Sequence, residues 1–176
     1  DILVNNAGIQ HISPVEKFTI NKWNEIISTN LSSVFFAIKY ALPHMKRKKW
    51  GRIINIASVH GLVASINKAA YVVAKHGVIG LTKAVALETA ETNITCNAIC
   101  PGWVYTPLVE AQVIKKSKKY NKSINKIKNE LLFEKHPSKK FVSISDIASL
   151  ANYLCSKEAS NIRGASWTID GGWSAQ

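Results

Sequence analysis

Three residues between positions 58 and 75 have types and spacings that could carry proton-transfer chemistry. Tyr71 and Lys75 are four residues apart in Ala69–Ala90, where apolar residues recur at three- and four-residue spacing. This spacing predicts a helix with both side chains on one face. A tyrosine hydroxyl titrates at about 10, and a neighbouring ammonium group favours the phenolate and lowers that pKa. Ser58 follows the apolar run Arg52–Ala57 and could hold the reacting oxygen.

The Tyr–Lys pair by itself is weak, because the same spacing usually places a surface lysine beside a half-buried tyrosine. The surrounding elements make the chemical interpretation stronger. β-Branched and small residues in Arg52–Ala57 predict a buried strand that delivers Ser58 at its carboxyl end. Further strands are predicted at Ile2–Val4, Asn93–Ile99 and Ala165–Ile169. Helices are predicted at Asn21–Met45, with Pro43 near its end, and from an N-cap at Ser145-Asp146.

Two turns follow predicted strands. Asn5-Asn6-Ala7-Gly8 follows the first strand, and Cys100–Pro107 contains two prolines and a glycine that force a rigid loop. In open α/β sheets, ligands bind at the carboxyl ends of the strands. Either segment could also be a simple turn.

Together these motifs resemble the short-chain dehydrogenase/reductase family over essentially the whole chain. The resemblance implies an α/β fold with a Rossmann-like, doubly wound parallel sheet. It also implies a catalytic tetrad of Asn30, Ser58, Tyr71 and Lys75, in which Asn30 holds a proton-relay water. Without the resemblance, Asn30 would be read as a satisfied core residue.

The resemblance further assigns residues to a cofactor, which it implies to be NAD. Asn6, Ala7 and Gly8 would lie against the adenosine ribose. The Pro101-Gly102 segment, with Val104 and Thr106, would hold the nicotinamide carboxamide, and Tyr71 and Lys75 would also contact the cofactor.

Candidate substrate residues surround the tetrad, and each could singly be an ordinary surface residue. A small hydroxy acid needs donors for its carboxylate, because a buried unpaired anion is costly. The set resembles the pocket of family members that oxidise D-3-hydroxybutyrate to acetoacetate. Its members are Gln10, Ser58, His60, Lys68, Tyr71, Trp103, Gln112 and Trp173.

One departure from the family is large. The motif T-G-x-x-x-G-x-G does not occur, and neither do the first three strand–helix units, on the order of 80 residues. That half cradles the pyrophosphate and chooses NAD over NADP. The sequence therefore predicts an N-terminally truncated domain, and two alternatives stay open. The chain could be a non-catalytic remnant, or one part of an enzyme split into two chains.

Composition narrows the function classes. The 176 residues, 47% apolar, fit one globular domain spanning 1–176, and no apolar run reaches the length of a membrane helix. Of the net charge of +12, ten lysines and two acids place +8 between Lys115 and Lys140. Few aromatic residues accompany these lysines, which disfavours nucleic-acid binding. A solvated surface is the plain interpretation, and attraction of anionic substrates is a further one.

The lysine-rich segment 107–141 shows only weak helical patterning and is expected to be an irregular substrate-covering lid. Cys96, Cys100 and Cys155 have no metal-ligand spacing, so we expect no metal site and a reducing, cytoplasmic location. The predicted helices Asn21–Met45 and Ala69–Ala90 match the pair that forms the dimer in the family. This match predicts a homo-oligomer, and the resemblance implies that it is a tetramer.

Overall fold

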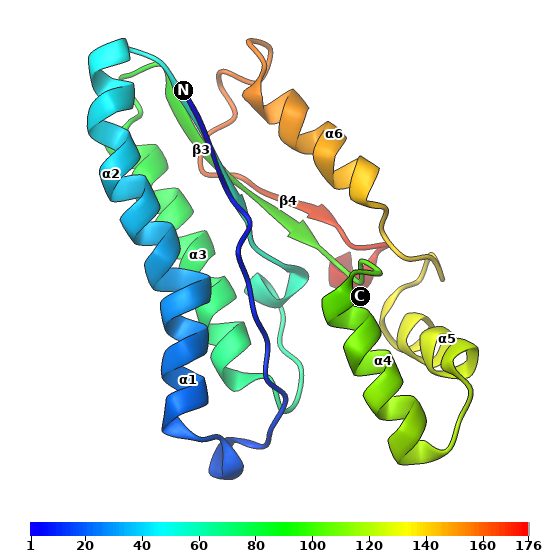
Figure 1. Cartoon of the computed structure of the whole chain (residues 1–176). Helices are drawn as coiled ribbons and strands as arrows, with labels where there is room; N and C mark the ends of the chain where they lie inside the picture. Colours follow the sequence, from blue (N-terminus) through cyan, green and yellow to red (C-terminus); the bar gives the residue numbers. More distant parts are fainter. Residues whose placement is uncertain (176) are drawn as a thin grey trace.

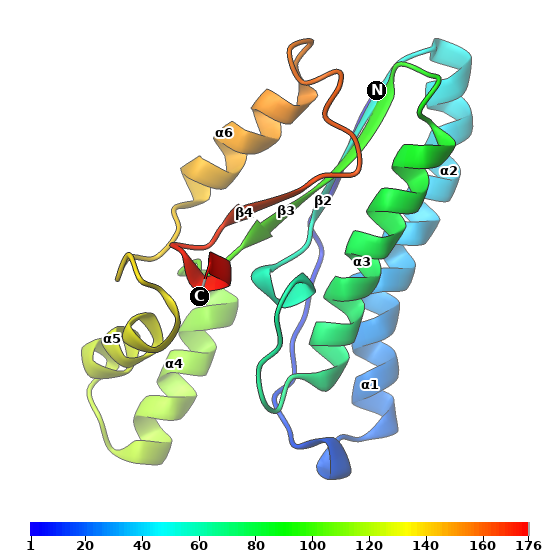
Figure 2. The same cartoon turned by 180° about the vertical axis from the view of Figure 1, so that it is seen from behind.

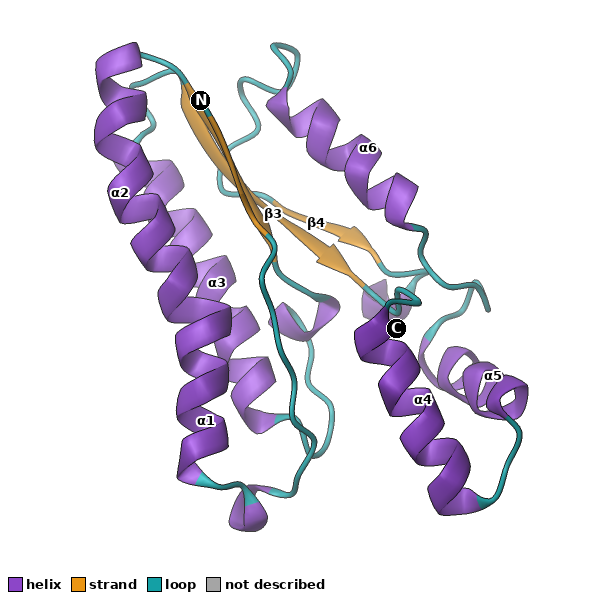
Figure 3. Cartoon of the chain, viewed as in Figure 1, coloured by secondary structure: helices purple, strands orange, loops and turns teal. Residues whose placement is uncertain are grey.

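The computed structural model describes residues 1–175, which form a parallel sheet flanked by helices on both faces. The sheet order is β1-β2-β3-β4, and every neighbouring pair is parallel. The strands are β1 (Ile2–Asn5), β2 (Gly51–Ile56), β3 (Ile94–Pro101) and β4 (Ser166–Ile169). The expected Rossmann-like α/β fold is confirmed, and Figure 3 shows the alternation of strands and helices.

Helices α1 (Ile20–Ile27), α2 (Ser33–Lys48) and α3 (Ala69–Glu88) lie on one side of the sheet. Helix α6 (Ile144–Cys155) lies on the opposite side, as Figures 1 and 2 both show. β2 and β3 are buried almost throughout because helices cover both of their faces. β1 is an edge strand, with Ile2 and Val4 about half exposed.

The first long helix differs from its prediction at both ends. A π-helical turn, Ser28–Ser32, joins α1 to α2, so helical backbone runs from Ile20 to Lys48. Pro43 was expected to close this helix, but it lies inside α2 on the exposed side. Water can there satisfy the carbonyl group that proline leaves unbonded. The helix ends instead at Lys49, which adopts left-handed backbone with a φ of 56°.

Helix α3 closely matches the prediction. It is long and apolar enough, by length and composition alone, to cross a membrane. The core helix of a soluble protein passes the same test, and α3 packs against β3 and the turn Val59–Gly61. Its interior face carries Ala70, Ala74 and Val78 into the apolar core. We therefore read α3 as a core helix.

The segment expected to be irregular forms two regular helices, α4 (Pro107–Tyr120) and α5 (Ile124–Lys135). They pack against each other through a small apolar core of Val109, Val113, Ile127 and Leu131. The abundant lysines obscured this sparse apolar periodicity in the sequence. The pair lies beyond the carboxyl ends of the strands, where a lid was predicted (Figure 1).

The N-cap of α6 also differs from its prediction. Ser143, rather than Ser145, caps the helix, because its Oγ accepts a hydrogen bond from the Asp146 N–H at 3.0 Å. Ser145 lies inside the first turn and shares a hydrogen bond with the Ser143 hydroxyl at 2.8 Å. The capping residue stands three positions before its bonded N–H, as in other N-caps.

Gly61 marks the closest approach between the turn after β2 and α3. A Cβ atom there would lie 2.6 Å from Ile79 Cδ1 and 2.8 Å from the Lys75 carbonyl oxygen. We expect Gly61→Ala to destabilise the fold by about 1–3 kcal/mol, because the backbone of α3 cannot yield as a flexible side chain can. The free energy of unfolding, from urea denaturation, measures this effect.

Gly80 is the matched control, since it lies exposed in α3 and a Cβ atom there would meet nothing within 4 Å. Gly80→Ala should stabilise the chain by about 1 kcal/mol through helix propensity. Equal effects of the two substitutions would contradict the tight packing at Gly61.

Candidate active site

The strand ends bring together segments that are far apart in the sequence. Asn6–Gly8 follows β1, Ser58 follows β2, and Gly102 follows β3. Because parallel strands all end at one edge of the sheet, these segments converge there. The carboxyl-end location predicted from the sequence is where the structure places them.

Ser58 lies at the start of a short 3-10 turn, Val59–Gly61, and its Oγ accepts a hydrogen bond from the His60 N–H at 3.1 Å. Its side chain also hydrogen-bonds Tyr71. Ser58 and Tyr71 therefore form a contiguous pair of hydroxyl groups, as the sequence predicted.

The pKa of Tyr71 is raised above its ordinary value, mainly by desolvation on burial, and the hydrogen bond with Ser58 partly offsets this rise. The sequence-based expectation was a lowered pKa, caused by Lys75. Lys75 instead donates from Nζ to the Ile56 carbonyl oxygen at 2.8 Å, and this Nζ lies 5.6 Å from the Tyr71 ring centroid. Burial also lowers the pKa of Lys75 to about 8. Desolvation therefore outweighs the influence of the ammonium, and Tyr71 is a neutral hydroxyl at pH 7.

Asn30 lies fully buried in the π-helical turn and is bonded to the loop after β1. Its Oδ1 accepts from the Ile9 N–H at 2.9 Å, and its Nδ2 donates to the Ile9 carbonyl at 2.8 Å. A Cβ atom on Gly8 would lie 3.9 Å from both Asn30 Oδ1 and Lys75 Nζ. The structure thus brings Asn30 near Lys75, while the water-holding role stays a prediction.

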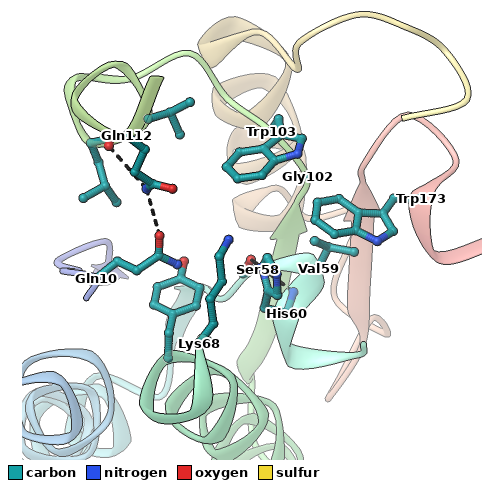
Figure 4. A pocket seen from close by; sticks show the side chains of 12 residues that line it. Gln10, Ser58, Val59, His60, Lys68, Gly102, Trp103, Gln112 and Trp173 are labelled. Atoms are coloured by element: carbon teal, nitrogen blue, oxygen red, sulfur yellow. Dashed lines mark hydrogen bonds between the residues drawn. The ribbon is translucent and has the colours of Figure 1, made fainter. Parts of the chain in front are cut away.

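A pocket of about 60 Å³ opens beside the Ser58–Tyr71 pair (Figure 4). All eight predicted substrate residues line it. The full lining is Gln10, Ser58, Val59, His60, Lys68, Tyr71, Gly102, Trp103, Leu108, Val109, Gln112 and Trp173. Gly102 was predicted as a cofactor residue, and the lining residues that the sequence analysis missed are the aliphatic ones, Val59, Leu108 and Val109, which carried no chemical signal.

Lys68 supplies the charge of this pocket. Its side chain is 7% exposed, and its Nζ lies 4.6 Å from the centroid of the Trp103 ring. Within residues 1–175, no carboxylate lies within 4.0 Å of this ammonium. Desolvation, followed by repulsion from Lys116, lowers the pKa of Lys68 to about 8. A buried cation without an acidic partner is suited to an anionic ligand.

His60 is neutral, because burial and then the nearby charge of Lys68 lower its pKa to about 3. Its Nε2 shares a hydrogen bond with the Ser65 hydroxyl at 3.0 Å. Its ring meets those of Tyr71 and Trp173 edge to face, with centroids 5.8 and 5.1 Å away. His60 can therefore supply a polar nitrogen to the pocket but no positive charge.

One hydrogen bond connects α4 to the loop after β1 beside the pocket. Gln112 on α4 donates from Nε2 to Gln10 Oε1 at 2.8 Å, and Figure 4 shows the two amides facing each other. The same Nε2 lies 3.3 Å from the Leu108 carbonyl oxygen. The amide pair places two further hydrogen-bonding groups beside Lys68.

Residues predicted to hold a cofactor lie on the same edge of the sheet. Gly8 has room above it, since a Cβ atom would meet nothing closer than 3.9 Å, so a ligand could approach this backbone. Thr106 precedes α4 without a side-chain capping bond, which leaves its hydroxyl available, and its N–H donates to the Val104 carbonyl at 2.8 Å. Pro101 ends β3 and leads directly into Gly102. These residues fit the nicotinamide and ribose end of a dinucleotide, whereas the 176 residues contain no glycine-rich phosphate motif.

Sequence reasoning also missed His136, which is fully buried behind Gly102 and accepts a hydrogen bond at Nε2 from the Trp103 N–H. A single histidine at the end of a lysine-rich helix gives no signal of this role. Among residues 1–175, no group of three or more His, Cys, Asp or Glu residues could hold a metal ion.

Comparison with known proteins agrees with this geometry. A family model described as enoyl-(acyl carrier protein) reductase matches residues 1–174. The chain is 55% identical to a D-beta-hydroxybutyrate dehydrogenase of Cupriavidus necator and 52% identical to one of Rhizobium meliloti. Each alignment covers all of this chain and 68% of the relative.

Solved structures that resemble this chain are also reductases and dehydrogenases. An actinorhodin polyketide ketoreductase with NADPH superposes with a TM-score of 0.94 at 34% identity, over 100% of this chain and 68% of that one. A 4-hydroxyisoleucine dehydrogenase complexed with NADH gives 0.82 at 34%, over 100% and 70%. The chain belongs to the short-chain dehydrogenase/reductase family and is by family an oxidoreductase. Within that family it is similar to D-beta-hydroxybutyrate dehydrogenases.

The charge of Lys68 gives a pH-dependent prediction for anion binding. Because its pKa is about 8, the ammonium is charged below that pH and is lost as the pH rises through it. We expect acetate to bind about tenfold more weakly well above pH 8 than at neutral pH, and Lys68→Met to bind weakly at both. Fluorescence of Trp103, beside the ammonium, reports the titration.

Acetamide is the control ligand, since it matches acetate in shape but carries no charge. Its affinity should not change over the same pH range. Acetate affinity that stays constant through pH 8 would contradict the assignment of Lys68 as the anion-binding group.

Proposed function

We propose that this chain carries the active site of an enzyme that oxidises D-3-hydroxybutyrate to acetoacetate with NAD. The observation that carries the proposal is the buried Lys68 ammonium beside the Ser58–Tyr71 hydroxyl pair in one small pocket. An anion site and a proton-transfer group that line one small pocket suit a short molecule with a carboxylate and a hydroxyl group. The similarity to D-beta-hydroxybutyrate dehydrogenases supports the same substrate.

In the proposed complex, the carboxylate lies against Lys68. Gln10, Gln112 and His60 offer uncharged hydrogen-bonding groups around it, and all three line the pocket. A charge-assisted hydrogen bond to Lys68 offsets the cost of removing the carboxylate from water. The stacked rings of Trp103 and Trp173, 6.0 Å apart, form the apolar wall for the methyl end.

The substrate hydroxyl group would lie between Ser58 and Tyr71. Oxidation removes a proton from that hydroxyl and a hydride from C3, and it leaves the carbonyl of acetoacetate. Tyr71 would first lose its own proton to the proposed relay water, and the resulting phenolate would accept the substrate proton while Ser58 hydrogen-bonds the same oxygen. When bound, the nicotinamide ring accepts the hydride. Because the pKa of Tyr71 is raised, its neutral hydroxyl also suits the reverse step, in which it protonates the ketone oxygen.

Lys75 and Asn30 would support this proton transfer without contacting the substrate. Lys75 keeps a partly desolvated ammonium near the tyrosine and close to Gly8, where the cofactor ribose would lie. Asn30 fixes the loop after β1 through both of its amide bonds to Ile9, and we propose that its turn holds the relay water. Lys75 thus places its ammonium near Tyr71, and Asn30 would place the relay water.

The size of the pocket favours a small acid over an acyl chain. At about 60 Å³, with Leu108, Val109 and the Gln10–Gln112 pair over it, the space suits a molecule of a few heavy atoms.

The choice of NAD rests on the resemblance to members that oxidise 3-hydroxybutyrate. The family half that selects between NAD and NADP does not occur in these 176 residues. We further propose that residues 1–176 are part of one dehydrogenase domain with a lid at 107–141, and that it works in the cytoplasm. The free thiols of Cys96, Cys100 and Cys155 are consistent with a reducing compartment.

Tyr71→Phe tests the proposed base. We expect formation of NADH from D-3-hydroxybutyrate and NAD to fall by at least about 10²-fold, because no other group accepts the proton. NAD binding, measured by calorimetry, should change little. Tyr120→Phe, an exposed tyrosine at the end of α4, is the matched control and should keep the wild-type rate.

A Tyr71→Phe variant with the wild-type rate would contradict the assignment of the base. A folded wild-type chain that binds acetate but forms no NADH would instead favour the non-catalytic remnant. Activity that appears only after a second chain with a glycine-rich half is added would identify a split enzyme.

We also propose that α2 and α3 form an interface between copies of this chain. A groove of about 380 Å³ lies between these helices, lined by apolar residues such as Phe35, Leu42 and Leu81. Phe35, Phe36 and Tyr40 are exposed on α2. Apolar helix faces of this kind are covered in homo-oligomers, and the resemblance implies a tetramer.

Phe35→Glu should therefore convert the oligomer to a smaller species, because the carboxylate would be buried without a partner. Light scattering after size exclusion measures the mass. Tyr120→Glu, which adds the same charge on the lid, should leave the mass unchanged. A wild-type chain that is monomeric at all concentrations tested would contradict the proposed interface.

A further inference from the structure

We propose that His136 is a positioning residue that fixes the Trp103–Trp173 wall of the pocket and connects it to the lid. The inference deepens the proposed function, because it names the group that holds the apolar wall against which the substrate would lie. His136 touches neither Ser58 nor Tyr71 in the hydrogen-bond network, so it would act through the two tryptophans.

Both ring nitrogens of His136 are hydrogen-bonded to backbone. Nε2 accepts from the Trp103 N–H at 2.8 Å, so the proton is assigned to Nδ1, which donates to the Lys140 carbonyl at 2.9 Å. The side chain has no exposed surface. A buried imidazole that uses both nitrogens in this way fixes the distance between the loop after β3 and the chain after α5.

Two glycines make room for this ring. A Cβ atom on Gly102 would lie 2.4 Å from His136 Nε2, and one on Gly171 would lie 2.9 Å from Nδ1. Gly171 also has a positive φ of 62°, which a side chain would disfavour. The imidazole therefore fills a space enclosed by the Pro-Gly loop and the turn after β4.

Trp103 is held through its backbone as well as through the contacts of its ring. Its indole Nε1 is buried and has no hydrogen-bond partner among residues 1–175. Its N–H is bonded to His136, and its carbonyl accepts from the Val142 N–H at 2.9 Å. Both backbone groups of Trp103 are thus bonded to the segment that follows α5.

The second tryptophan packs directly on the same imidazole. The His136 and Trp173 centroids are 5.9 Å apart, and Trp173 stacks on Trp103 at 6.0 Å with an interplanar angle of 29°. Trp173 also meets His60 edge to face at 5.1 Å. A continuous set of rings therefore runs from His136 to the residue beside Ser58.

His136 also ends the second helix of the lid segment, α5. It is the C-cap of α5, and its N–H donates to the Leu132 carbonyl at 2.8 Å. The Gln10–Gln112 bond connects the other lid helix to the far side of the pocket. Through His136, the position of the lid is coupled to the wall of the pocket.

Two substitutions distinguish the contribution of the His136 hydrogen bonds from the contribution of its side-chain volume. His136→Gln keeps one acceptor and one donor on a side chain of similar reach, so it can bond both Trp103 and Lys140. His136→Leu fills the space but leaves the buried Trp103 N–H without a partner. His44→Leu makes the same change at an exposed histidine of α2 and is the matched control.

Three measurements are made on the full chain: acetate affinity by calorimetry, near-ultraviolet circular dichroism and the melting temperature. We expect His136→Leu to bind acetate about tenfold more weakly and to lose the dichroism of the stacked indoles. His136→Gln should keep the affinity within about threefold and retain that dichroism. The control should match the wild type in all three.

A merely structural role would lower the melting temperature of both variants without changing the affinity or dichroism of the folded chains, and this would overturn the proposal. Equal losses in the Gln and Leu variants would also overturn it. If His136→Leu does not fold, His136→Asn replaces it, since asparagine is too short to bond both partners. The dichroism is read without ligand or turnover, so a failure of the proposed reaction leaves this test decisive.

Discussion

Desolvation of ionisable groups at the carboxyl ends of the strands governs the chemistry of this molecule. Two lysines, Lys68 and Lys75, are buried with no carboxylate of residues 1–175 within 4.0 Å, and Tyr71 lies between them in sequence, in α3. Burial lowers the pKa of each lysine to about 8 and raises that of the tyrosine. The two lysines are thereby held where a modest change in their surroundings alters their protonation, whereas Tyr71 is held as a neutral hydroxyl.

The parallel sheet supplies the rigidity that this arrangement needs. β2 and β3 are covered on both faces, so the turns at their ends are anchored in the core. Asn30 bonds the Ile9 carbonyl in the loop after β1, and Lys75 bonds the Ile56 carbonyl at the end of β2. The polar side chains therefore have fixed backbone partners, which keeps their geometry within the narrow tolerance of a reacting site.

The lid combines two physical roles on opposite faces. Its inner face packs on Trp103 and Tyr105 through a small apolar core, whereas its lysines give the segment a strong positive charge. A cation-rich surface above a pocket attracts anions by long-range electrostatics. Under the proposed function this charge would favour an acidic substrate, and it also accounts for the weak helical pattern in the sequence.

The sequence by itself determined the strands and the long helix with Tyr71 and Lys75, because apolar periodicity encodes these locally. The polar lining of the pocket followed from the family resemblance. Figure 4 shows polar residues from four separate segments meeting in one place, as the resemblance implied. Only the tertiary structure decided the direction of the Tyr71 pKa, the two regular lid helices and the place of His136. Desolvation depends on every chain segment around a group. The partners of His136 are backbone atoms at Trp103 and Lys140, and the Trp103 N–H, 33 residues away, carries no side-chain signal that a sequence could reveal.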